Sequence, residues 1–265
     1  PEKNSKGKGV RKGYLWVVVG INTRMIYLLY DDGSRSERVI LNELGSCKGI
    51  IQSDGYSPYR KLESDAYPHI TRIPCLQHIK RKFIDSGEND PDVKRIVELI
   101  NALYQNEHKH KVGVEGWTVE QNLMHRKKYA PDILGEIKDV LDEIEERGDL
   151  LPKSELQEAI TYLRNEWNAV VDIFNYGDTY LDNNMVERMN RYISLSRKNS
   201  LFFGSHKGAE RGAILYTIAL TCRMHKVNLF EYLTDVINRT AEWQPNTPIE
   251  KYRELLPDRW EKAND

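Results

Sequence analysis

Apolar and polar positions near the start of the chain follow the pattern of short β-strands. Residues 14–19 and 25–30 are rich in β-branched and aromatic side chains, and Gly20 to Arg24 separates them. This pattern predicts a β-hairpin. Four more elements are then expected, namely a short helix, two strands and a helix, over residues 36–44, 49–55, 68–74 and 75–84. This mixture of strands and helices indicates a mixed α/β layer.

From residue 90 onward the apolar spacing is that of helices alone. Asp90 and Pro91 form a favourable helix start. Two capping boxes are expected as well, at Thr118-x-x-Gln121 and at Ser154-x-x-Gln157. Apolar residues recur at helical spacing up to residue 174, so we expect a helical hairpin packed beside the sheet.

The last part of the chain contains one strongly apolar helix and a proline-containing tail. Residues 209–224 are apolar on nearly every face, which predicts a buried helix. The tail carries Pro245, Pro248 and Pro257 and is expected to lie across the surface.

Composition indicates a soluble globular protein of a reducing, cytoplasmic compartment. Of the 265 residues, 40% are hydrophobic and 30% are charged. Three scattered cysteines are too few for a disulfide framework, and no apolar run is long enough to span a membrane. The chain opens with Pro1 and a polar stretch, so we expect a fragment that begins within a loop.

The net charge of −1 at first argues against binding to nucleic acid. The charges are unevenly distributed, however. Acidic residues gather over 136–149, whereas basic residues gather at Lys80 to Lys82 and from Arg188 to Arg211. Because phosphate contacts act at short range, the local basic segments keep DNA binding open.

One candidate functional group is Asp54, which follows an apolar strand and precedes Gly55. The carboxyl ends of buried strands are where open α/β sheets place functional groups. The alternative is a turn aspartate that hydrogen-bonds its own backbone. Taken alone, this position favours the structural alternative.

A second candidate is Glu187, in the run Leu181 to Arg188. The Asp-Asn-Asn stretch in that run predicts a helix cap, after which Glu187, Arg191 and Lys198 would share one helical face. This face fits either an exposed ion pair or a metal-binding carboxylate beside phosphate-binding cations. Helix geometry leaves both alternatives open.

Two further segments carry weaker signals. Residues 196–205 combine cations, small polar groups and aromatics, as a loop on a DNA backbone would, or as an ordinary basic loop would. The pair Cys75-x-x-His78 has no second pair at zinc-site spacing, so we interpret both residues as packing groups or supports for a metal site.

Together and in this order, the motifs resemble the DDE transposases of the IS66 group of bacterial insertion sequences. The first three matched family motifs are Gly-Tyr-Leu-Trp at residues 13–16, a strand-end Asp-Gly-Tyr at 54–56, and Cys-x-x-His with basic residues and Phe at 75–83. The other three are Asp-Asn-Asn-x-x-Glu-Arg at 182–188, Arg-Lys-Asn with Leu-Phe and Gly-Ser at 197–205, and Leu-Leu-Pro with a final Trp at 255–260. The resemblance therefore covers nearly the whole chain.

The sequence also departs from the family pattern. Ser200 stands where the family often has Trp, and Leu76 stands where it often has an aromatic residue. In the family, the first catalytic aspartate lies on a strand just before Gly-Tyr-Leu-Trp, usually within Asp-Glu-Thr, and nothing before Gly13 matches it. The helix-turn-helix and zinc-binding region expected further upstream is not matched either. We therefore expect a truncated core that is inactive or poorly stable by itself.

For the fold, the resemblance implies an RNase H-like mixed α/β sheet with a large all-helical insertion, lacking its central first strand. The expected parts are a polar linker, a first RNase H-like part, the helical insertion, closing helices and a tail, over residues 1–12, 13–88, 89–176, 177–241 and 242–265.

For the activity, the resemblance implies a transposase that cleaves and transfers DNA strands in a metal-dependent reaction. Asp54 and Glu187 would be two of three carboxylates holding two Mg²⁺ ions, with Mn²⁺ as a substitute. Contacts to DNA are expected from Arg188, Arg191, Arg197, Lys198, Lys80, Arg81 and Lys82. Supporting roles are expected for Cys75, His78, Asn183 and Asn184. A homo-oligomer on transposon ends and target DNA, in the bacterial cytoplasm and at the nucleoid, is implied.

Two other functions remain open from the sequence. One is a non-catalytic DNA-binding remnant of a decayed element. The other is an RNase H-fold nuclease such as a junction resolvase, which fits the acids but not the ordered motifs.

Overall fold

The computed structural model describes residues 12–109, 117–196, 198–200 and 202–262. The chain divides into two compact units. Unit 1 takes in Pro1–Val39 and Asn184–Asp265, and unit 2 takes in Ile40–Asn183. Among the described residues, no helix is long and apolar enough to cross a membrane.

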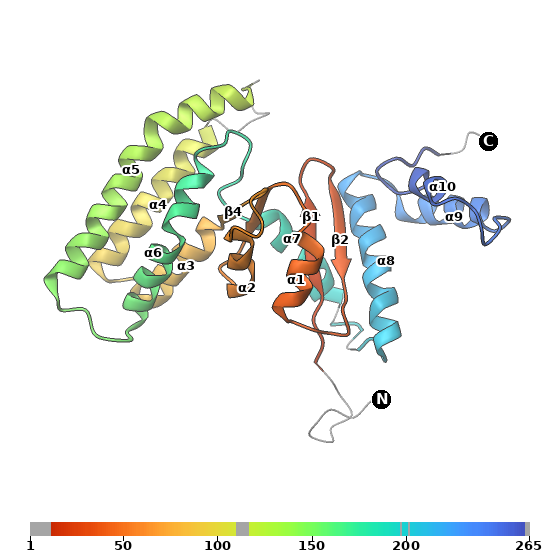
Figure 1. Cartoon of the computed structure of the whole chain (residues 1–265), viewed down its shortest axis with the longest axis horizontal. Helices are drawn as coiled ribbons and strands as arrows, with labels where there is room; N and C mark the ends of the chain where they lie inside the picture. Colours follow the sequence, from red (N-terminus) through yellow and green to blue (C-terminus); the bar gives the residue numbers. More distant parts are fainter. Residues whose placement is uncertain (1–11, 110–116, 197, 201, 263–265) are drawn as a thin grey trace, which may run out of the picture. The chain divides into compact units, whose positions relative to one another are not determined.

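Unit 1 is built on the predicted β-hairpin. Strand β1 (Trp16–Gly20) pairs antiparallel with β2 (Met25–Leu29), with Trp16 opposite Leu29. Helix α7 (Asn184–Ser196) packs against β1, and α8 (His206–Met224) runs along β2 (Figure 1). The hairpin and these two helices enclose an apolar core that contains Ile26, Leu28, Met189, Ile193, Ala213 and Leu220.

Helix α8 holds the outer edge of β2 through two threonine side chains. The Leu28 amide donates to Thr217 Oγ1 at 2.9 Å, and the Ile26 amide donates to Thr221 Oγ1 at 3.1 Å. These bonds satisfy strand groups that would otherwise be unpaired. Two more helices, α9 (Leu229–Thr240) and α10 (Ile249–Glu254), follow in unit 1.

The prediction that residues 209–224 are buried on nearly every face is wrong. Ile214 is 56% exposed and Leu215 is 60% exposed. A two-stranded hairpin is too narrow to surround a helix, so α8 buries only the stripe that contains Ala213, Leu220 and Thr221.

Unit 2 contains the second pair of strands. Helix α1 (Glu37–Leu44) crosses from unit 1 into unit 2 and leads to β3 (Gly49–Ser53). Strand β3 pairs in parallel with β4 (Ile70–Pro74), so that Ser53 lies opposite Pro74. Between the strands lie the short helix α2 (Ser57–Arg60) and the 3-10 helix η1 (Lys61–Glu63). Helix α3 (Leu76–Gly87) follows β4.

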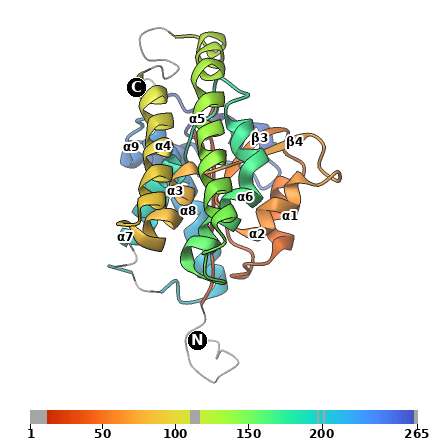
Figure 2. The same cartoon turned by 90° about the vertical axis from the view of Figure 1, so that its left-hand side faces the viewer.

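The rest of unit 2 is helical, as predicted. Helices α4 (Pro91–Lys109), α5 (Val119–Arg147) and α6 (Glu155–Ile173) lie side by side (Figures 1 and 2), and their described residues form no strand. Their core contains Ile96, Ile100, Leu103, Ile137, Leu141, Leu163 and Ile173, and it includes Ile79 and Phe83 of α3.

Two of the predicted helix caps are confirmed and a third is formed in part. Asp90 Oδ1 accepts from the amide of Asp92 at 2.8 Å, and Thr118 forms a complete capping box with Gln121. The second box is incomplete. Ser154 Oγ accepts from the Gln157 amide, but the Gln157 side chain binds the Lys153 amide instead of the Ser154 amide.

The mixed α/β class is confirmed. In the described part of the chain the strands form two separate two-stranded sheets, β1 with β2 and β3 with β4. The RNase H-like arrangement and the expected domain boundaries stay predictions.

Candidate functional site

Asp54 projects from the turn that directly follows β3. Its Oδ1 accepts a hydrogen bond from the Tyr56 amide at 3.1 Å. This is the bond expected of a turn aspartate, so the structural role does exist. A carboxylate has about four acceptor positions, so one such bond leaves room for a metal ion or another donor.

A buried charged network lies beneath this turn. Arg72 on β4 is 3% exposed and forms ion pairs with Glu63 and with Glu166, which is fully buried on α6. The second oxygen of Glu166 lies 2.7 Å from Arg60 Nη2 on α2. Burial alone would lower the pKa of Arg72, but the hydrogen bonds and charges of Glu166 and Glu63 outweigh it and raise that pKa.

The network reaches Asp54 through Ser53. Arg72 Nη1 lies 3.5 Å from Ser53 Oγ, which in turn donates to the Asp54 carbonyl at 2.9 Å. Ser53 is 5% exposed, so the bonds around it are shielded from water. Strand β3, strand β4 and helix α6 therefore meet at the turn that carries Asp54.

Sequence reasoning missed Arg72 and Glu166. A signal for Glu166 existed, because it stands three residues after Leu163 and four before Val170, on the buried stripe of α6. A charged residue at such a position is rarely buried without a partner. The partner itself could not be identified, since Arg72 lies 94 residues away in the sequence.

Tyr162 on α6 covers the same turn. A Cβ atom placed on Gly55 would lie 1.9 Å from Tyr162 Oη, so a larger residue there would force the tyrosine side chain to shift. Burial, followed by the negative charges of Glu166 and Asp54, raises the pKa of Tyr162 to about 12. Lys82 Nζ lies 4.9 Å from the centre of the Tyr162 ring. Lys82, one of the predicted DNA contacts, thus lies beside the tyrosine that covers the Asp54 turn.

The loop after α6 is held by two buried residues of α5. Asn122 Nδ2 donates to the Gly177 carbonyl at 2.7 Å. Arg126, which is 0% exposed, donates to the Thr179 carbonyl at 2.7 Å and to the carbonyls of Ile173 and Tyr176. Its charge is matched by an ion pair with Glu107.

The end of this loop also binds the strand region. Gln52 Nε2 donates to the Tyr180 carbonyl at 2.7 Å, and the Leu76 amide donates to the Leu181 carbonyl at 2.9 Å. The Asn183 amide donates to Cys75 Sγ at 3.5 Å. The structure thereby brings Cys75 and Asn183, two of the predicted supporting residues, into contact within unit 2.

Cys75 is buried, which fits a packing group, and its predicted supporting role stays a prediction. It is 1% exposed, and burial raises the pKa of its thiol. A protonated, buried thiol is chemically inert. His78 lies half-buried one helical turn further along α3, followed by the half-buried Lys80 and the exposed Arg81.

Glu187 lies in the first turn of α7, in unit 1, together with Asn184. Arg188 and Arg191 are exposed on the same helix, while Met189 and Ile193 are buried. The prediction that Lys198 shares a helical face with Glu187 is wrong, because α7 ends at Ser196 and Lys198 lies in the exposed turn beyond it. Arg197 lies outside the described residues.

Asp54 and Glu187 belong to different units, so their approach to one another stays a prediction. Within the described ranges, no three or more histidine, cysteine, aspartate or glutamate side chains gather as a metal-binding group. The two-metal site with its third carboxylate therefore also stays a prediction.

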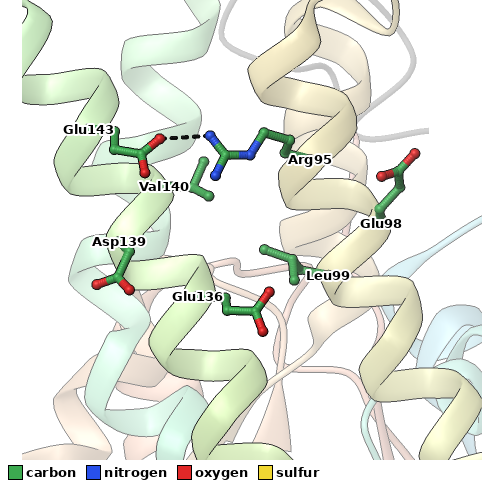
Figure 3. Close-up of a pocket in the computed structure, with 7 residues that line it drawn as sticks. All are labelled: Arg95, Glu98, Leu99, Glu136, Asp139, Val140 and Glu143. Atoms are coloured by element: carbon green, nitrogen blue, oxygen red, sulfur yellow. Dashed lines mark hydrogen bonds and ion pairs between the residues drawn. The ribbon is translucent and has the colours of Figure 1, made fainter.

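A surface hollow between α4 and α5 is unsuited to DNA. It has a volume of about 410 Å³ and is lined by four carboxylates and one arginine, with Leu99 and Val140 (Figure 3). The arginine, Arg95, already pairs with Glu143 at 2.7 Å. The remaining negative charge would repel phosphate groups.

Comparisons with known proteins agree with the family that the motifs resemble. Residues 2–211 match the model of the Transposase IS66 family. Three similar proteins come from Sinorhizobium fredii. "Uncharacterized protein y4jD" is 29% identical over 86% of this chain and 44% of its own length. "Uncharacterized protein y4hP" is 31% identical over 82% of this chain and 40% of its own, and "Uncharacterized protein y4qI" is 28% identical over 90% and 46%.

The chain thus spans less than half the length of these curated relatives. No solved structure matches it significantly. The family match extends from before the β-hairpin, through the Asp54 turn and α7, into α8. On this match, the chain belongs to the Transposase IS66 family.

Proposed function

We propose that this chain is the catalytic core of a transposase that cleaves and joins DNA strands, with Asp54 and Glu187 as metal-binding carboxylates. The observation that carries the proposal is the Asp54 turn. A partly exposed carboxylate stands at the carboxyl end of a strand, on a turn held by a buried network, in a chain of a transposase family.

The charges around Asp54 fit a cation. Two buried or half-buried arginines lie nearby, Arg60 and Arg72, but Glu166 and Glu63 already match their charges. The negative charge of Asp54 is therefore left for another cation. Carboxylate oxygens are the hard ligands that Mg²⁺ prefers.

In this proposal the chain's own residues bind and orient the reactants. Asp54 and Glu187 would hold Mg²⁺, which when bound supplies activation of a water or a 3′-hydroxyl and stabilisation of the leaving oxygen. Cationic side chains would hold the DNA backbone, namely the exposed Arg188, Arg191 and Lys198 in unit 1 and, in unit 2, the exposed Arg81 and Lys82 with the half-buried Lys80. An assembly of several copies on transposon ends and target DNA is part of the proposal.

A test compares carboxylate variants in the full-length protein. Asp54→Asn and Glu187→Gln keep the side-chain size but lose the charge that holds Mg²⁺, so both should abolish Mg²⁺-dependent nicking of a labelled duplex carrying the transposon end. The affinity for that DNA should stay nearly unchanged, because the cations remain in place. Glu210→Gln, an exposed acid on α8, is the control and should nick normally.

The alternative is a DNA-binding remnant without catalytic activity. In that case the wild-type protein would bind DNA and nick nothing at any Mg²⁺ concentration. Nicking by Glu187→Gln at the wild-type rate would instead make Glu187 an ordinary ion-pair partner and refute the assignment.

A further inference from the structure

We infer that Glu166 on α6 is a positioning residue for Asp54, because its buried carboxylate holds both arginines that flank the Asp54 turn. One carboxylate oxygen pairs with Arg72 on β4, the strand beside the turn. The other lies 2.7 Å from Arg60 on α2, the helix that follows the turn. The inference rests on the proposed role of Asp54 as a metal ligand.

Burial makes this arrangement rigid. Glu166 is 0% exposed, and Arg72 is 3% exposed. Ion pairs between exposed side chains contribute little and exchange readily with water. The Glu166 carboxylate is shielded from water, so its contacts with the two arginines do not exchange readily with solvent. The two arginines are therefore held at fixed places on either side of the turn.

The contacts then run from Glu166 to the turn itself. Arg72 approaches Ser53 Oγ, and Ser53 Oγ donates to the Asp54 carbonyl. One helical turn before Glu166, Tyr162 lies against Gly55 so closely that a Cβ atom at Gly55 would force the tyrosine side chain to shift. Helix α6, which belongs to the helical part of unit 2, thus packs directly against the Asp54 turn.

This geometry predicts how the network acts on the reaction. Groups that orient a ligating carboxylate typically change metal affinity or activity by about 10- to 100-fold when they are removed. Loosening the turn should therefore lower the nicking rate and raise the Mg²⁺ concentration that gives half the maximal rate. Affinity for DNA should not change, because Glu166 is not at the surface.

The first variant, Glu166→Gln in the full-length protein, keeps the side-chain size and removes the charge. Because it leaves Arg72 buried with only the Glu63 carboxylate, it risks losing the fold. The second variant, Arg60→Gln, removes one arm of the network from a side chain that is 33% exposed. Arg60→Lys restores the charge and should restore part of the activity.

Arg164→Gln is the matched control. Arg164 lies on α6, the helix that carries Glu166, and is 26% exposed. Its ion pairs are with Asp142 and Glu145, which do not belong to the network around the Asp54 turn. Three quantities are measured for each variant: the thermal melting curve, the Mg²⁺ dependence of nicking, and hydrogen exchange of the Tyr56 amide, which donates to Asp54 Oδ1.

The expected result is a roughly tenfold slower nicking rate for Arg60→Gln, with faster exchange at Tyr56, a higher Mg²⁺ midpoint and unchanged DNA affinity. Arg164→Gln should behave as wild type. The inference is overturned if Arg60→Gln matches wild type in rate and exchange, if its loss lies only in DNA affinity, or if Arg164→Gln is equally impaired. Failure of the proposed function gives a different result, because either the wild-type protein would then nick nothing or Asp54→Asn would nick at the wild-type rate.

Discussion

At the scale of single residues, Gly177 determines how closely the loop after α6 can approach α5. A Cβ atom at this position would lie 2.0 Å from the Val119 carbonyl oxygen, which belongs to the first turn of α5. Backbone atoms of a helix cannot move aside as a side-chain end could. The same loop is held by Asn122 and Arg126, so the segment leading to Asp182 has little freedom to adjust.

We therefore expect Gly177→Ala to destabilise the protein by about 1–3 kcal/mol, the usual cost of overpacking. Gly135→Ala is the matched control, because a Cβ atom there meets nothing and Gly135 lies within helix α5. That control should stabilise the protein by about 0.5–1 kcal/mol. Urea unfolding of both variants measures the difference. Equal effects of the same sign would contradict the close approach seen at Gly177.

At the scale of elements, a bidentate ion pair stabilises the segment after α10. Arg253 donates to both carboxylate oxygens of Asp258, each at 2.7 Å. Tyr232 of α9 donates to the Leu255 carbonyl at 2.8 Å and ties the same segment to α9. The hydrogen bonds from Arg253 lower the pKa of Asp258 below its usual value, against the smaller effect of burial.

The lowered pKa has a consequence for stability against pH. Because the folded-state pKa is below the unfolded value of about 3.9, the pair stabilises the fold above that pH and loses its effect as pH falls through the folded pKa. Asp258→Asn should therefore cost up to about 1 kcal/mol at pH 7, and the difference from wild type should shrink toward zero in strong acid.

Urea unfolding between about pH 3 and pH 7 tests this expectation, because this range extends below the unfolded-state pKa of about 3.9. Glu254→Gln, an exposed acid on α10, is the control and should leave the curve unchanged. A cost for Asp258→Asn that stays constant down to the lowest pH would show that the charge of Asp258 contributes nothing.

At the scale of the whole molecule, the net charge of −1 conceals separate basic and acidic surfaces. Arg81 and Lys82 are exposed on α3, and Lys82 lies beside Tyr162 near the Asp54 turn. The hollow between α4 and α5 is acidic instead. If DNA passes the Asp54 turn, the basic surface of α3 should contribute to the salt dependence of binding, and the acidic hollow should not.

Replacing Arg81 and Lys82 with Ala should weaken DNA binding for all sequences and reduce the slope of log affinity against log salt by roughly one unit per lost contact. Lys127 and Lys128, another adjacent exposed pair, lie on α5 and provide the control when replaced in the same way. Fluorescence anisotropy over a salt titration measures both slopes. An equal reduction in the control would mean that binding depends on overall charge rather than on the α3 surface.

Local pattern determined much of this molecule. The hairpin, the strand before Asp54 and the helices from Pro91 to Ile173 follow from residue spacing and caps, which act between residues a few positions apart. The ordered motifs also predicted the transposase family that the match to residues 2–211 confirms. The strand-end position of Asp54 could be predicted for the same reason.

Only the tertiary structure decided what surrounds that aspartate. Glu166 and Arg72 pair across 94 residues, and Tyr162 of a distant helix lies against Gly55, so local residue spacing could predict neither contact. The sequence did not predict the exposed side of α8. The apolar residues of a helix do not indicate how wide its packing partner is, and the partner's width determines how much of the helix is buried. Sequence periodicity determines which face of an element is apolar, whereas the charges and shapes that meet that face depend on how the chain folds back on itself.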